Sequence, residues 1–157
     1  MPKDSHPMAM LNTAVLVMEH ESEFRKAYDA GTSKDQLWIP MLEDSITLLS
    51  RMTTVAAGIY RMRFNKGERI APKEGLDWSG NFAYMLGLSE DGTGEFADLI
   101  RTYLVLHSDH GAGNVSAMTA STVGSALSDV YYSLSAGLNG LAGPLHGLAN
   151  QECLKFV

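Results

Sequence analysis

Apolar residues recur at steps of three and four positions along most of this chain, which is the spacing of one face of an α-helix. The first stripe consists of Met8, Leu11, Val15 and Met18. A longer stripe consists of Leu42, Ile46, Leu49, Thr53, Ala56 and Tyr60. This second stripe predicts a long helix that follows an N-cap at Ser33, holds Pro40 in its first turn and ends near Phe64.

The second half of the chain shows the same helical spacing, and no segment alternates apolar and polar residues as a strand would. The expected helices lie at residues 78–87, 96–106, 114–128, 129–138 and 146–157. The helix over 114–128 is rich in Ala, Ser, Thr and Gly, so it can approach a neighbouring helix closely. We therefore predict an all-α fold of about seven helices.

Size and composition indicate one folded domain over residues 1–157, with 45% hydrophobic and 19% charged residues. The net charge of −6 comes without a basic stripe, which argues against nucleic acid as a partner. No run of 18 apolar residues exists, so no membrane span is expected. Cys153 is the single cysteine, so an intrachain disulfide is excluded. The first residues resemble neither a signal peptide nor a transit peptide, which leaves the compartment open.

The last residues still follow a helical pattern. The segment from Glu152 to Val157 is amphipathic, and no glycine caps it. We expect from this that the chain is a piece of a longer protein. A frayed natural terminus is the alternative.

A cluster of polar residues follows the helix expected at 96–106. His107 and His110 are three positions apart, which places them on one side if the helix continues. A metal site is one interpretation, although it needs a further ligand; two hydrogen-bonded structural histidines are another. The glycines before Asn114 favour a third, a site for a small anion, because they let the backbone come close to it. Asn114 itself could cap the next helix or donate its amide to a carboxylate.

His146 follows the Gly143-Pro144 turn at the expected start of the last helix. The positive end of a helix dipole disfavours protonation there, so we expect a neutral imidazole. A neutral imidazole that donates an N–H can stabilise an enolate. The alternative is a histidine that only packs or caps after the turn.

Four segments together resemble the citrate synthase family of eukaryotic type. They are Leu106-His107-Ser108-Asp109-His110, Gly113-Asn114-Val115-Ser116-Ala117, Gly124-Ser125-Ala126-Leu127-Ser128-Asp129, and Asn139 through Glu152. Weaker matches extend the resemblance over nearly the whole chain. It implies a fragment of an all-α large domain, a homodimer, and a Claisen condensation of acetyl-CoA with oxaloacetate followed by thioester hydrolysis. Neither a metal nor a cofactor is implied.

The resemblance also assigns roles to the histidines. His146 matches the residue that stabilises the enol, His110 matches one that binds the keto acid with Asn114 close by, and His107 matches a supporting position. The chain departs from its near relatives at Gly111-Ala112, where they carry Glu-Gly, and at Met118, where they carry histidine. The family's second catalytic histidine, its catalytic aspartate and several arginines would follow Val157.

Two hypotheses result. The first is a condensing enzyme for acyl-CoA and oxaloacetate, present as a fragment that is inactive alone, in the mitochondrial matrix or the cytoplasm. Within it, the altered residues leave room for a 2-methylcitrate or alkylcitrate synthase. The second is a non-catalytic homologue that acts as a dimerisation or regulatory partner.

Overall fold

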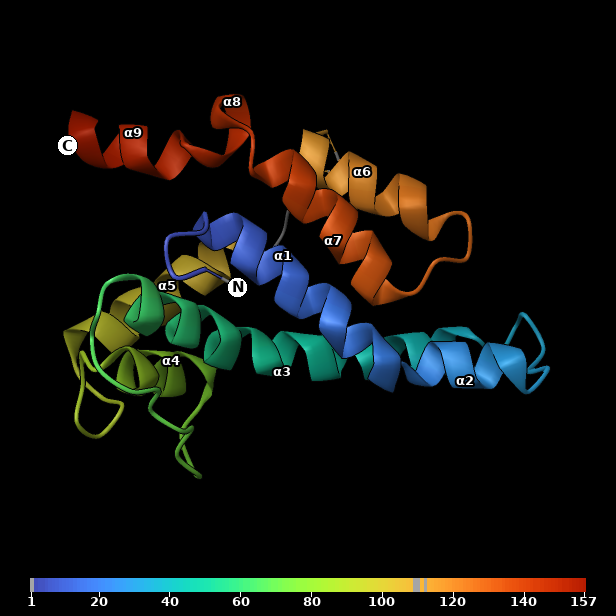
Figure 1. The fold of residues 1–157 in the computed structure, drawn as a ribbon, viewed down its shortest axis with the longest axis horizontal. Coiled ribbons are helices and arrows are strands. Elements are labelled where there is room, and N and C mark those ends of the chain that lie inside the picture. Colours follow the sequence, from blue (N-terminus) through green and yellow to red (C-terminus); the bar gives the residue numbers. More distant parts are fainter. Residues whose placement is uncertain (1, 109–110, 112) are drawn as a thin grey trace. The chain divides into compact units, whose positions relative to one another are not determined.

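The structure is a computed structural model that describes residues 2–108, 111 and 113–157. Its elements are α1 (Pro7–Met18), the 3-10 turn η1 (Glu19–Glu21), α2 (Glu23–Asp29), α3 (Trp38–Arg63), α4 (Trp78–Leu86), α5 (Glu95–His107), α6 (Val115–Gly124), α7 (Val130–Leu141), α8 (Pro144–Gly147) and α9 (Ala149–Phe156) (Figure 1). These residues contain no strand, so the prediction of an all-α fold is confirmed. Within the same part of the chain, no helix has both the length and the apolar character that crossing a membrane requires.

The helices differ from the predicted ones in several places, and the helix expected over 114–128 ends at Gly124. The start predicted for α3 is wrong, because the residues after Ser33 form tight turns closed by bonds from Gln36 N–H to the Ser33 carbonyl and from Leu37 N–H to the Lys34 carbonyl. Pro40 still lies in the first turn, where its missing N–H is tolerated. The last expected helix is divided into α8 and α9, and α2 is additional. The described residues therefore form nine α-helices rather than seven.

The chain divides into two compact units that alternate along the sequence, and each is described by itself. Unit 1 comprises Met1–Leu11 and Thr47–His110, and unit 2 comprises Asn12–Ile46 and Gly111–Val157. The core of unit 1 is formed by Ala57 of α3 with Met85 and Leu86 of α4. The aromatic residues packed against it are Tyr60, Phe82, Tyr84 and Phe96.

Arg61 of α3 ties the following loop to the end of α4 in unit 1. Its guanidinium donates to the carbonyls of Glu68 at 2.7 Å and Leu86 at 3.1 Å, and also to that of Lys66. Because one side chain satisfies three carbonyls, the irregular segment after α3 keeps a defined path.

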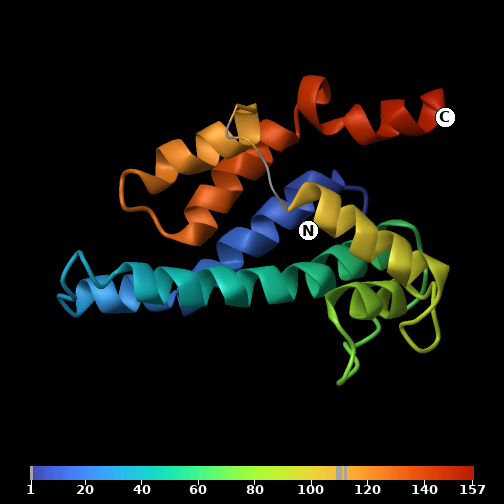
Figure 2. The same ribbon diagram turned by 180° about the vertical axis from the view of Figure 1, so that it is seen from behind.

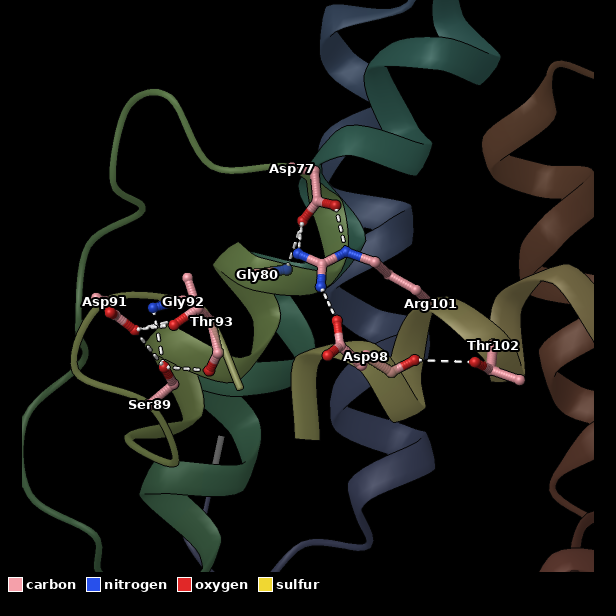
Figure 3. A network of polar contacts seen from close by, with 9 residues as sticks. All are labelled: Asp77, Gly80, Ser89, Asp91, Gly92, Thr93, Asp98, Arg101 and Thr102. Carbon is pink, nitrogen blue, oxygen red and sulfur yellow. Dashed lines mark hydrogen bonds and ion pairs between the residues drawn. The ribbon is translucent and has the colours of Figure 1, made fainter. Parts of the chain in front are cut away.

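Asp77 joins α4 to α5 through a network of charged groups (Figure 3). Its Oδ1 caps α4 by accepting the Gly80 N–H at 2.7 Å. Arg101 of α5 donates to both oxygens of Asp77, at 2.6 and 3.0 Å, and to Asp98 at 2.6 Å. Arg101 is therefore the largest influence that holds the pKa of the Asp77 carboxyl below its usual value, and the Gly80 N–H adds to it.

The buried carboxylate of Asp44, on α3, organises the start of α2 in unit 2. Its oxygens accept the Ser22 hydroxyl at 2.7 Å, the Glu23 N–H at 2.9 Å and the Phe24 N–H at 3.0 Å. The Ser22 hydroxyl oxygen in turn accepts the Arg25 N–H at 3.1 Å as the N-cap of α2. One carboxylate thus satisfies donors of a helix start that would otherwise lack partners.

Asp129 caps α7 in a different electrostatic setting. Its Oδ1 accepts the Tyr132 N–H at 2.9 Å, and the residue is only 5% exposed. Burial raises the pKa of this carboxyl, and the negative charges of Glu19 and Asp44 raise it further. The Tyr132 N–H acts in the opposite direction. The ionised form of Asp129 is therefore disfavoured in the folded chain.

Replacing Asp77 should destabilise unit 1 in a pH-dependent way. Asp77→Ala should lower the free energy of unfolding by about 1 kcal/mol at pH 7 through loss of the N-cap. Because the pKa of Asp77 is lowered in the folded state, its contribution is complete above the unfolded pKa of about 3.9 and is lost as the pH falls through the folded value. Urea unfolding from pH 7 to acid measures this. Asp98→Ala is the control, since Asp98 contacts the same arginine without capping α4; an equal loss in both variants would contradict the role of the cap.

Asp129→Asn should have the opposite effect. Asparagine can still accept the Tyr132 N–H, but it brings no buried charge, so the variant should be more stable than the wild type at neutral pH. Because burial raises the folded pKa of Asp129, its penalty is complete above that pKa and disappears below the unfolded value of about 3.9. The gain in unfolding free energy should therefore shrink on acidification. A gain that is independent of pH would show that charge is not its cause.

Candidate functional site

The candidate site lies in unit 2, where α6 and α7 pack side by side (Figures 1 and 2). Glycines of α7 make the contact close. A Cβ added at Gly137 would lie 3.0 Å from the Ser116 carbonyl oxygen, and one at Gly140 would lie 2.9 Å from Cγ1 of Val115. Small residues on α7 therefore bring the backbone of α6 at Ser116 almost into contact with it.

The one-turn helix α8 holds His146 after the turn at Gly143. The N–H groups of His146 and Gly147 donate to the Gly143 carbonyl at 3.0 and 2.8 Å. A Cβ at Gly147 would lie only 2.2 Å from the Leu141 carbonyl oxygen, so this position requires glycine. Helix α8 is thus folded tightly against the end of α7, so the backbone at His146 has little freedom to move.

Three side chains form a continuous series of hydrogen bonds at this point. Nε2 of His146 lies 2.8 Å from the Ser116 hydroxyl oxygen. The Ser116 hydroxyl lies 2.7 Å from Oδ1 of Asn114, and the same Oδ1 accepts the Ala117 N–H at 2.8 Å. All three side chains are half-buried. Asn114 is therefore the N-cap of α6, which is one of the two roles considered for it, and it is also linked to His146 through Ser116.

The expectation that His146 begins a long helix is wrong. It is the third residue of the four-residue α8, and α9 begins at Ala149. Such a short helix supplies little dipole, so the dipole is a weak reason for a neutral imidazole here. The contact with Ser116 determines the environment of Nε2 instead.

His107 has a different environment in unit 1. It is the exposed last residue of α5; its Nδ1 donates to the Tyr103 carbonyl at 2.8 Å, and its ring stacks on Tyr103 with 3.9 Å between centroids. The structure brings Asn114 and His146 together within one unit. His110, the expected keto-acid ligand, lies outside the described residues, as does Asp109.

The metal hypothesis gains no support from the part of the chain that the structure describes, because no group of three or more His, Cys, Asp or Glu residues lies close enough there to hold an ion.

Met118, where the chain departs from its near relatives, lies on α6 one turn after Asn114 and is 56% exposed.

Ser116 is the residue whose role sequence reasoning missed. A serine in the second position of a helix is ordinary, and its contact with His146 joins residues 30 positions apart. The available signal was indirect: small residues on the predicted helix over 114–128 indicated that it could approach a neighbouring helix closely.

Three comparisons with known proteins agree with the resemblance found in the sequence. The whole chain, residues 1–157, matches the sequence profile of the family described as "Citrate synthase, C-terminal domain". It is 48% identical over 157 residues to the mitochondrial citrate synthase of Daucus carota, covering 100% of this chain and 33% of that protein. It is 49% identical over 158 residues to the mitochondrial 2-methylcitrate synthase of Fusarium solani, covering 99% of this chain and 34% of that protein. The solved structure of citrate synthase from Pyrobaculum aerophilum matches with a TM-score of 0.84 and 30% identity, covering 98% of this chain and 38% of that one. The chain spans about a third of the length of the two curated relatives.

Gly147→Ala should displace His146. The added methyl group meets a backbone carbonyl that cannot move away, so we expect a loss of about 1–3 kcal/mol of unfolding free energy and changed ring resonances of His146. Gly143→Ala is the matched control, because its φ is −69° and its Cβ would meet only the Gly140 carbonyl oxygen at 3.5 Å. Urea unfolding and NMR of the histidine rings measure both effects. Equal behaviour of the two variants would refute the packing argument.

Proposed function

The chain belongs to the citrate synthase family, as its motifs predicted, and we propose on that premise that it is part of an enzyme that condenses an acyl-CoA with oxaloacetate. The reaction is a Claisen condensation followed by hydrolysis of the thioester. The observation that supports this most directly is the hydrogen bond between His146 and Ser116, since it holds a half-buried imidazole in one orientation. A histidine held in this way is prepared to donate to an oxygen that becomes negative.

The proposed roles follow from this arrangement. His146 stabilises the enol of the acyl group, and Asn114 positions it through Ser116. From the resemblance to the family, we infer that His110 and His107 contribute to the binding of oxaloacetate. The base that removes the proton lies outside this chain, because the chain contains neither a Gly-x-Gly-His nor an Asp-Pro-Arg segment. We infer that the reaction uses acyl-CoA as a substrate and requires no further cofactor or metal.

The proposal extends to assembly and compartment. We propose that the chain is a fragment of the family's large domain in a homodimeric enzyme. Because the relatives from Daucus carota and Fusarium solani are named mitochondrial, we propose the mitochondrial matrix as the compartment.

A longer acyl group is the second candidate. The relative from Fusarium solani is named a 2-methylcitrate synthase and is as similar to this chain as the citrate synthases are. Met118 adds an exposed apolar side chain close to Asn114 on α6. Propionyl-CoA is therefore a substrate worth comparing with acetyl-CoA.

The test uses the protein of the longest open reading frame that contains this chain. Release of free CoA should depend on oxaloacetate, and His146→Ala should lower kcat about 10²–10³-fold, because one donor to the developing charge is lost. His20→Ala is the control, since His20 is exposed and contacts the Val17 carbonyl and the Glu21 carboxylate rather than the candidate site. The ratio of kcat/KM for acetyl-CoA and propionyl-CoA identifies the acyl group.

The 157-residue chain alone should release no CoA, because it lacks the base. Steady turnover by this chain that depends on His146 would contradict the assignment of the base. A full-length protein without turnover that binds an active citrate synthase would instead support the non-catalytic alternative.

A further inference from the structure

We propose that unit 1 contains a binding site for an organic phosphate, in a groove lined by α3, the loop that follows it and Lys3. The groove has a volume of about 730 Å³, which is in the range of sites for small organic ligands. All the residues that line it belong to unit 1, and none of them belongs to the candidate site around His146. Binding in this groove is therefore independent of the proposed condensation reaction.

Positive charge is concentrated at this groove, although the chain is acidic overall. Residues 61–69 contain four of the 12 basic residues of the chain and one acidic residue. Arg61, Glu68 and Arg69 of this segment line the groove, and Lys3 lines it as well. The lining thus carries three positive charges and one negative charge, which favours an anionic ligand.

Two of these cations are available to a ligand. Arg61 is engaged, because its guanidinium donates to backbone carbonyls of the loop and of α4. Within the part of the chain that the structure describes, the side chains of Lys3 and Arg69 are exposed and have no hydrogen-bond or ion-pair partner. A guanidinium offers paired N–H donors that match two phosphate oxygens, and an ammonium adds a compact charge. Lys3 and Arg69 are therefore suited to hold a phosphate dianion.

The side of the groove formed by α3 is largely apolar. It is lined by Val55, Ile59 and Met62, the last of which is 36% exposed. Phosphate alone would leave this surface in water, whereas the apolar part of an organic phosphate would cover it. The lining therefore favours a phosphate that carries an apolar group.

Gly58 leaves space in the groove beside Arg69. It lies in the interior of α3, where glycine is less favourable than alanine. Its neighbours do not require glycine, because an added Cβ would meet only the Arg69 side chain, at an ordinary contact distance of 3.7 Å. A larger side chain would occupy the groove. What glycine provides at this position is room for a ligand next to a free guanidinium.

Phenyl phosphate is the probe for this site, since at about pH 7.5 it combines a dianion with an apolar ring. Isothermal titration calorimetry measures its binding to the protein of the longest open reading frame that contains this chain. Inorganic phosphate should bind more weakly. Arg69→Ala should weaken the binding of phenyl phosphate about tenfold, the value of one hydrogen bond to a charged group. Glu68→Gln should strengthen it, because a like charge is removed.

Lys34→Ala is the control for net charge. Lys34 is an exposed cation of unit 2, so its loss should leave the affinity unchanged. Amine-reactive labelling followed by peptide mass spectrometry gives a local readout, in which phenyl phosphate should protect Lys3 and leave Lys34 reactive.

Gly58→Leu tests the groove without changing its charge. Leucine favours the helix more than glycine does, so the variant should unfold at a temperature no lower than that of the wild type. Because the added side chain fills the groove, the preference for phenyl phosphate over inorganic phosphate should be lost.

An organic phosphate has two sources here, the proposed acyl-CoA substrate and a separate small molecule. A raised KM for acyl-CoA in Arg69→Ala identifies the substrate, whereas an unchanged KM with weaker binding of phenyl phosphate identifies a separate ligand. Equal affinity for phenyl phosphate in the wild type and Arg69→Ala would overturn the assignment of this site. So would weaker binding in Glu68→Gln, or an intact preference in a folded Gly58→Leu variant. A protein that binds phenyl phosphate as expected but releases no CoA would count against the proposed function alone.

Discussion

The candidate site depends on the close approach of α6 to α7. Without side chains at Gly137 and Gly140, the two backbones come near enough for Ser116 to reach a histidine that follows α7. A hydrogen bond of 2.8 Å tolerates little change in length. A methyl group added between the two helices would therefore move them far enough apart to break it. The hydrogen bonds among Asn114, Ser116 and His146 therefore depend first on the close packing of the two backbones.

The same chemical device appears at four helix starts in this chain, with different consequences. Side-chain oxygens of Ser22, Asp77, Asn114 and Asp129 each accept an N–H of the following turn. Arg101 neutralises Asp77, whereas Asp129 is buried near other carboxylates, so their pKa values shift in opposite directions. Asn114 carries no charge, yet its oxygen accepts a second hydrogen bond, from the Ser116 hydroxyl. A neutral cap is thus linked through Ser116 to the imidazole of His146 without adding a charge to the site.

Much of the fold could be predicted from the sequence, because helical periodicity is a local property. The stripe from Met8 to Met18 corresponds to α1, and Gly87 ends α4 in the left-handed conformation. The break at Leu148 was not predicted, because leucine favours helices and the close contact between Gly147 and the Leu141 carbonyl joins residues of two different helices. The start of α3 was missed for a similar reason: the turns after Ser33 depend on backbone bonds that no side-chain pattern reveals.

The site was only partly accessible from the sequence. His146 and Asn114 were found because their residue types and neighbours carry chemistry, and the resemblance gave them roles. Ser116 carries no such signal, and its importance comes from where two helices place it. The three residues lie in one compact unit, where the Ser116 hydroxyl contacts both Asn114 and His146. The position of His146 therefore follows from packing within this unit, which the pattern of any single helix does not reveal.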